Sequence, residues 1–212
     1  ELALDNIDEA MKYAQKALDL SGEVGERLEV GLSKAVIARV FAAKGDNEEA
    51  LEYIEQGVNI LRDVGEPYEL ARTLLMAAVI RNTAVTDEAD TVNALLKEAH
   101  RRFRGLKLDY WIAEVDFQIG VFDCQCGNLS RGFRKLNRAE KVFARLDEKI
   151  QVRAVHKFLQ TLSEQAVALS ISQQNQYKIF GNLITPAELS NLKGNQMEDI
   201  LEILLKRTRG DR

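Results

Sequence analysis

The chain has 212 residues, of which 46% are hydrophobic, and a formal net charge of −4 at pH 7. This length fits one large domain or a stack of about five two-helix repeats. No window of about 18 uninterrupted apolar residues exists, so we expect no transmembrane helix. Only two prolines, Pro67 and Pro186, interrupt the chain, which suits an all-α fold. The two cysteines, Cys124 and Cys126, are too few for a disulfide framework, which favours a cytoplasmic setting.

Charge is divided unevenly along the chain. Residues 1–100 contain 10 Lys/Arg and 20 Asp/Glu, a net charge of −10, whereas residues 101–212 contain 19 and 13, a net charge of +6. Such a division can steer a partner or dock one copy of the chain on another, although an ordinary solvated surface can carry it too. We therefore expect weak, salt-sensitive self-association into a homodimer, for which apolar surface near residues 177–184 supplies most of the affinity.

The segment closest to the N-terminus returns 40 positions later. Glu9, Ala10 and Tyr13 recur as residues of the same type at positions 49, 50 and 53. A fixed period with helical spacing inside it indicates a helical repeat protein. Residues 6–20 then form the second helix of a unit whose first helix is missing. Because the chain begins at Glu1 without a methionine, we expect the natural chain to begin further upstream.

The clearest unit has helices expected at residues 28–44 and 47–62. Gly45 ends the first helix, since glycine enters the left-handed conformation at little cost. Asp46 begins the second helix, and Glu49 completes a capping box with it. Small side chains would let the two helices approach closely at Ala38, Ala50 and Gly57. Apolar spacing predicts the later helices at 68–82, 88–104, 109–126, 130–146 and 150–172.

This spacing resembles the tetratricopeptide (TPR) repeat. The residues that match the family positions are Ile37, Ala38, Phe41, Gly45, Ala50, Ile54 and Gly57, and in a later unit Ile119, Gly120, Gly127, Gly132, Leu136 and Ala139. Lys34, Asp116 and Asp123 depart from the pattern. HEAT and armadillo repeats have periods closer to the 40–42 residues seen here, but the Gly–x–x–x–Glu–Ala pattern favours TPR.

The resemblance implies an all-α superhelix, or α-solenoid, of antiparallel helix pairs. Residues 1–172 would form four or five units, the first of them incomplete. The resemblance also implies a non-catalytic region that binds a protein or a peptide, because extended TPR helices occur in bacterial regulators and peptide sensors. A free-standing peptide-responsive sensor is the alternative to a region of a larger protein.

Residues 173–212 are expected to be a helical linker or a capping segment. Residues 195–205 and 210–212 resemble the junction that leads into a GAF domain in bacterial multidomain proteins for signal transduction and transcription regulation. We therefore expect the chain to stop just before a further, GAF-like domain. A helix that caps the last repeat is the alternative.

The sequence contains no motif for catalysis, for a cofactor or for a metal. His100 and His156 are solitary and are expected on helix surfaces. Trp111 and Tyr110 open a helix as Tyr68 opens the previous one, which favours a role in packing between repeats. In a superhelix the first helices of the units line the inner face, so they supply the expected ligand contacts. The candidate partner-binding residues are Lys34, Arg39, Arg72, Arg81, Glu114, Gln118 and Asp123.

Basic residues recur every three or four positions between 131 and 145. They are Arg131, Arg134, Lys135, Arg138, Lys141 and Arg145. Such a row can follow phosphates, but the whole chain is acidic and no aromatic residues interleave for base stacking. A solvated face or a docking surface for acidic residues is therefore favoured over nucleic-acid binding.

Overall fold

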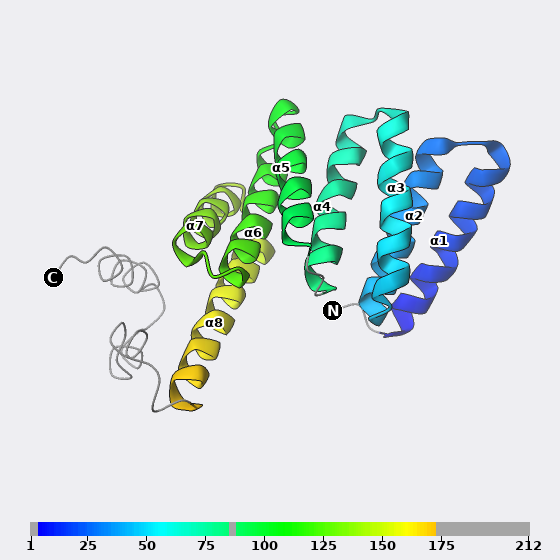
Figure 1. Ribbon diagram of the computed structural model, residues 1–212. Coiled ribbons are helices and arrows are strands. Elements are labelled where there is room, and N and C mark those ends of the chain that lie inside the picture. The colour runs from blue at the N-terminus through cyan, green and yellow to red at the C-terminus, as the bar shows by residue number, and fades with distance from the viewer. Residues whose placement is uncertain (1–3, 85–87, 173–212) are drawn as a thin grey trace. The chain divides into compact units, whose positions relative to one another are not determined.

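The computed structural model describes residues 4–84 and 88–172, and within them every regular element is an α-helix (Figure 1). The eight helices are α1 (Leu4–Val24), α2 (Arg27–Lys44), α3 (Asn47–Val64), α4 (Pro67–Thr83), α5 (Ala89–Gly105), α6 (Asp109–Gln125), α7 (Leu129–Arg145) and α8 (Lys149–Ser172). From α2 onward their ends lie within two residues of the predicted ends. The expected linker, the apolar residues 177–184 expected to support self-association and the GAF-like junction all lie outside the described residues.

The chain divides into two compact units, Glu1–Phe122 and Asp123–Arg212. In the first unit α2 packs against both α1 and α3, and α4 packs against α2, α3 and α5. In the second unit α7 packs against α8. Because α4 has neighbours on several sides, it is apolar around most of its circumference. Its buried residues are Leu70, Ala71, Thr73, Leu74, Leu75, Ala77, Ala78 and Ile80.

A left-handed residue lies between most successive helices. In the first half of the chain the residue is always glycine, with φ of 74° at Gly25, 89° at Gly45 and 84° at Gly65. The same conformation returns after α5, α6 and α7, at Lys107, Gly127 and Asp147. These positions follow one another at 20-residue steps (25, 45, 65, then 107, 127, 147). The 40-residue sequence period is therefore two helices, each ended by a left-handed residue.

The predicted capping box at Asp46 is not formed. Asp46 is the residue before α3, as expected, but its side chain makes no capping hydrogen bond. Its backbone has φ −80° and ψ 74°, whereas a capping side chain usually needs an extended backbone. The tight turn instead uses backbone atoms, since the Asn47 N–H donates to the Gly45 carbonyl oxygen at 3.0 Å.

Two glycines let α2 and α3 meet backbone to backbone. A Cβ atom at Gly57 would lie 3.0 Å from the Gly31 carbonyl oxygen, and one at Gly31 would lie 2.9 Å from Cγ of Leu61. The predicted close approach at Gly57 is therefore confirmed. Its partner Gly31 was not predicted, because the sequence does not show which residue of α2 faces Gly57.

The close contact predicts a position-specific effect of valine. Gly57→Val should lower the free energy of unfolding by about 1–3 kcal/mol, because the new side chain overpacks the α2–α3 contact. Gly22→Val is the matched control: Gly22 is also helical, and a Cβ there would meet nothing within 4 Å. That variant should stay within about 0.5 kcal/mol of the parent. Urea denaturation of both proteins checks this, and equal effects would contradict the observed approach.

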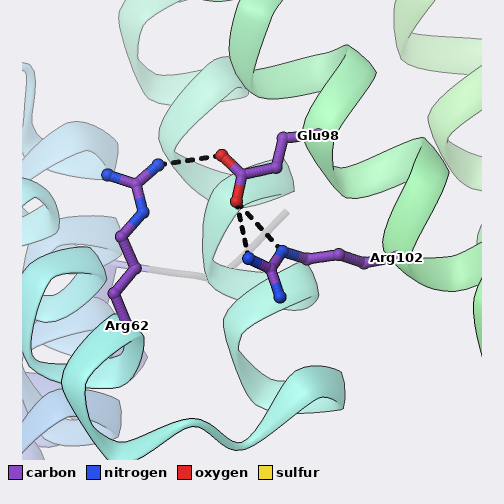
Figure 2. A network of polar contacts seen from close by, with 3 residues as sticks. All are labelled: Arg62, Glu98 and Arg102. Atoms are coloured by element: carbon purple, nitrogen blue, oxygen red, sulfur yellow. Dashed lines mark hydrogen bonds and ion pairs between the residues drawn. The ribbon is translucent and has the colours of Figure 1, made fainter.

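A polar network joins α3 to α5, the second helices of successive pairs (Figure 2). An Arg62 guanidinium nitrogen donates to Oε2 of Glu98 at 2.8 Å. Arg102, one turn further along α5, donates to Oε1 of Glu98 from two nitrogens at 3.0 and 2.8 Å. Burial by itself raises the pKa of Glu98, but the hydrogen bonds from Arg102 and Arg62 outweigh it and the pKa is lowered.

Glu98 should therefore stabilise the fold in a pH-dependent way. Its carboxyl has a lower pKa in the folded chain than the ordinary 4.5, so its contribution is present above pH 4.5 and is lost as the pH falls through the folded pKa. Glu98→Gln should cost about 1 kcal/mol at pH 7, a modest value because both arginines are partly exposed.

The measurement is thermal unfolding of Glu98→Gln between pH 7 and pH 3. The difference in melting temperature between the variant and the parent should disappear as the pH falls to 3. Glu23→Gln, which changes an exposed glutamate of α1, is the control and should show no such gap. A gap that persists at low pH would show that the carboxylate charge is not what matters.

Candidate partner-binding surface

The first helices of the successive pairs are α2, α4 and α6. Each keeps one side partly exposed, and the exposed positions are equivalent from one helix to the next. On α2 these positions are 29, 32, 36, 39 and 43, and on α4 they are 69, 72, 76, 79 and 83, each 40 residues later. On α6 they continue at 111, 114, 118 and 121. The three- and four-residue steps place each set on one side of its helix. We call these positions the first-helix surface, and they are a mixture of apolar and charged residues.

The apolar members of this surface are Leu32, Val36, Met76, Val79, Trp111 and Val121. Val36 is 42% exposed, which is high for a valine on a helix that packs against three others. Leu32, Met76 and Trp111 touch the core with one side and remain partly exposed on the other. Exposed apolar residues that recur along successive helices indicate a surface that contacts another molecule.

Arg72 and Trp111 join the first-helix surface of α4 to that of α6. The Arg72 guanidinium carbon lies 5.5 Å from the centre of the Trp111 ring and 5.6 Å from that of Tyr68. A nitrogen of Arg72 also lies 3.0 Å from Oε2 of Glu69. Trp111 in turn stacks on buried Phe103, with ring centres 5.3 Å apart. The arrangement holds a cation and an aromatic ring at fixed positions on a partly exposed surface.

Four of the seven predicted contact residues lie on the first-helix surface. Arg39 is exposed, Arg72 lies over the two aromatic rings, and the Gln118 amide donates to Oε1 of Glu114 at 3.1 Å. That these four residues contact a partner stays a prediction. The apolar members around them were not predicted as contacts. The 40-residue step from Val36 to Met76 was present in the sequence and would have revealed that pair.

The other three predicted residues face elsewhere. Lys34 lies toward α3, where its amine donates to Gln56 at 2.6 Å and sits 5.3 Å from the centre of the Tyr53 ring. Arg81 donates a hydrogen bond to Glu88, just before α5, and lies 3.7 Å from Glu55 of α3. Exposure was wrongly expected for Asp123, which is only 2% exposed. The reason is helical geometry, since a residue on a first helix can point to a neighbouring helix as easily as to the inner face.

The α6 helix carries two buried aspartates that are paired with basic side chains. Nε2 of His100 on α5 lies 3.2 Å from Oδ1 of Asp116, and Nε of Arg131 on α7 lies 2.9 Å from Oδ2 of Asp123. Burial raises the pKa of Asp123, and the charges of Arg131 and Lys135 only partly offset this rise. His100 was expected to be a solitary surface residue and is neither solitary nor fully exposed.

The second histidine also has a carboxylate partner. Nε2 of His156 on α8 lies 2.6 Å from Oε1 of Glu140 on α7, and both side chains are partly exposed. Cys124 is buried, and burial, with the charge of Asp123 adding to it, raises the pKa of its thiol to about 11. This thiol therefore stays protonated and unreactive at neutral pH. These residues contribute to packing rather than to a reactive site.

The described residues contain neither a membrane-spanning helix nor a metal-binding cluster. None of their helices is long and apolar enough to cross a membrane. No group of three or more His, Cys, Asp or Glu side chains among them is placed to hold a metal ion.

The arrangement of helices matches a solved structure. The chain is similar to BtubC (BKLC) from P. vanneervenii, with a TM-score of 0.60 over 97% of this chain and 85% of that one, at 16% sequence identity. This chain has a TPR-like helical-repeat fold. The expected fold class is thereby confirmed: the described helices form successive antiparallel pairs. No family model matches the sequence. No curated protein matches it either.

The burial of Glu114 leads to a prediction about how the stability of the fold depends on pH. Burial raises the pKa of Glu114, and the hydrogen bond from Gln118 only partly offsets this. The folded chain thus holds the proton more tightly than the unfolded chain, so stability falls as the pH rises from the ordinary 4.5 through the folded pKa. Glu114→Gln removes that loss and keeps an oxygen that accepts from Gln118. It should raise the free energy of unfolding by roughly 1 kcal/mol at pH 7.

Denaturation of both proteins at several pH values is the measurement. Below pH 4.5 the two curves should coincide, because the parent carboxyl is then protonated in both states. A variant that is less stable than the parent at pH 7 would show that the Glu114 charge has a stabilising partner.

Proposed function

We propose that the chain is a non-catalytic module that binds a protein or a peptide through its first-helix surface. The proposal rests on the partly exposed apolar residues on the same side of α2, α4 and α6, where Val36 and Met76 hold equivalent positions, as do Val79 and Val121. A surface used only for solvation has no need of Val36, Met76 and Trp111 on this side of the helices. The similarity of fold to BtubC is compatible with a scaffold role.

The composition of the surface suggests the chemistry of the ligand. An extended or helical segment could place apolar side chains against the valines and Met76, while its charged groups meet Arg39 on α2 and Glu114 on α6. Aromatic and arginine residues are the usual energetic centres of such interfaces, and Trp111 with Arg72 provides one of each. We further propose that the module works in the cytoplasm as part of a larger bacterial regulatory protein, as the sequence of residues 195–212 suggests.

Trp111 makes the proposal directly testable, because it is the only tryptophan of the chain. Peptides selected for binding from a displayed library should change its fluorescence emission when they occupy the surface. Val36→Asp should weaken their binding by about tenfold or more, since a charge in an apolar contact is unfavourable. Val24→Asp is the matched control: Val24 is 74% exposed on α1, outside the surface, and binding should be unchanged.

Two results would contradict the proposal. One is a set of selected peptides that bind without any change in Trp111 emission. The other is an equal loss of binding in both aspartate variants, which would place the contact elsewhere.

A further inference from the structure

A straight row of cations lies along the exposed side of α7. Its members are Arg131, Arg134, Arg138, Lys141 and Arg145, all exposed, and we call them the basic stripe. The opposite side of α7 is buried through Gly132, Leu136, Ala139 and Phe143. Because the cations alternate by three and four residues, they remain on one side of the helix for about 21 Å.

The stripe has much more positive than negative charge on its own helix. The α7 sequence contains six Lys/Arg and a single acidic residue, Glu140, whose carboxylate lies beside His156. Arg131 pairs with Asp123 at one end of the stripe. The two aromatic residues of α7, Phe133 and Phe143, lie outside the stripe and are not fully exposed. The stripe thus offers charge without rings on which bases could stack.

The α3 helix of the first unit has the opposite character. Its sequence contains five Asp/Glu and one arginine. Glu48, Glu52 and Glu55 are exposed at steps of four and three residues, and we call them the acidic stripe. Glu52 accepts one hydrogen bond from Gln56, and Glu55 lies 3.7 Å from Arg81, so each carboxylate retains capacity for a further donor.

The two stripes have the same spacing. Glu48 and Glu55 are seven residues apart on α3, as are Arg134 and Lys141 on α7, so each pair is separated by about 10.5 Å along its helix. Two straight helices laid side by side can therefore bring several opposite charges together at once. A flexible or curved polyanion gains no such match from the spacing.

We propose that the basic stripe of α7 binds the acidic stripe of α3 in a second copy of this chain. The contact is heterologous, since each copy offers one stripe of each sign, and it can close into a ring or extend. Exposed ion pairs are individually weak and are screened by salt, so the association is weak and reversible. It uses different helices from those of the first-helix surface and does not depend on the proposed function.

Sedimentation velocity at several protein concentrations tests the association. At about 0.1 M salt the Debye length is about 10 Å, and at about 1 M it is about 3 Å. The association constant should fall by about tenfold or more between the two. A monomer at every concentration and salt level, or an association that salt leaves unchanged, would overturn the proposal.

Charge reversal locates the contact. The doubly substituted variants Arg134→Glu/Lys141→Glu and Glu48→Lys/Glu52→Lys should each lose most of their self-association. The first lowers the charge of the basic stripe from +5 to +1, and the second changes that of the acidic stripe from −3 to +1. Mixing the two variants should restore it, since the unchanged basic stripe of the α3 variant can then meet the unchanged acidic stripe of the α7 variant. All substituted positions are exposed, and circular dichroism confirms that the variants stay helical.

The control reverses two exposed cations elsewhere. Lys97→Glu/Arg101→Glu on α5 changes the net charge by the same amount as the α7 variant and should leave association intact. The proposal fails if this control abolishes association equally, or if the mixture of the stripe variants stays monomeric. It also fails if the chain is monomeric and duplex DNA binds it in a manner abolished by Arg134→Glu/Lys141→Glu, because the stripe would then be a nucleic-acid surface.

Discussion

The left-handed residue between successive helices is the constraint on which the rest of the structure depends. It follows six of the eight described helices, at 25, 45 and 65 and again at 107, 127 and 147. Helices of equal length then place equivalent positions side by side. The interval from 65 to 107 is two residues longer than two such steps, and the extra length falls across a segment that contains the longer turn after α4. Exposed positions on α6 therefore follow those on α4 by 42 residues, and the surface continues.

Glycine supplies the left-handed conformation at four of the six positions, and Lys107 and Asp147 supply it at the others. An aspartate tolerates this conformation better than most residues, whereas lysine has no such advantage. Sequence inspection found the glycine turns because glycine marks them. It placed the ends of α5 and α7 from apolar spacing alone, and those ends were also correct.

The sequence predicted the helices well and their pairwise contacts less well. Helix positions depend on local signals, such as the apolar spacing of α3 and the glycine after it. Contacts depend on which side of a helix meets which neighbour. Gly57 was expected at a close approach, but its partner Gly31 was not. The pairing of His100 with Asp116, which are 16 residues apart, also depends on how α5 turns back into α6.

For the candidate surface too, the positions of the helices were easier to predict than the directions of their side chains. The helices that carry it were predicted, and Arg39, Arg72, Glu114 and Gln118 lie on it. Lys34, Arg81 and Asp123 do not, because polarity alone does not tell which way a side chain points. The burial of Asp123 was the hardest feature to predict from the sequence. A carboxylate is usually exposed unless it has a basic partner, and the partner Arg131 lies on the next helix.

The link between Arg62 and Glu98 has a consequence for how the first unit unfolds. In a repeat protein each pair of helices touches only its neighbours, so unfolding can proceed one pair at a time unless adjacent pairs are strongly coupled. Arg62 and Glu98 lie on the second helices of adjacent pairs, and their ion pair adds directly to that coupling. Weaker coupling favours sequential unfolding, in which α4 and α5 can open while α2 and α3 remain folded.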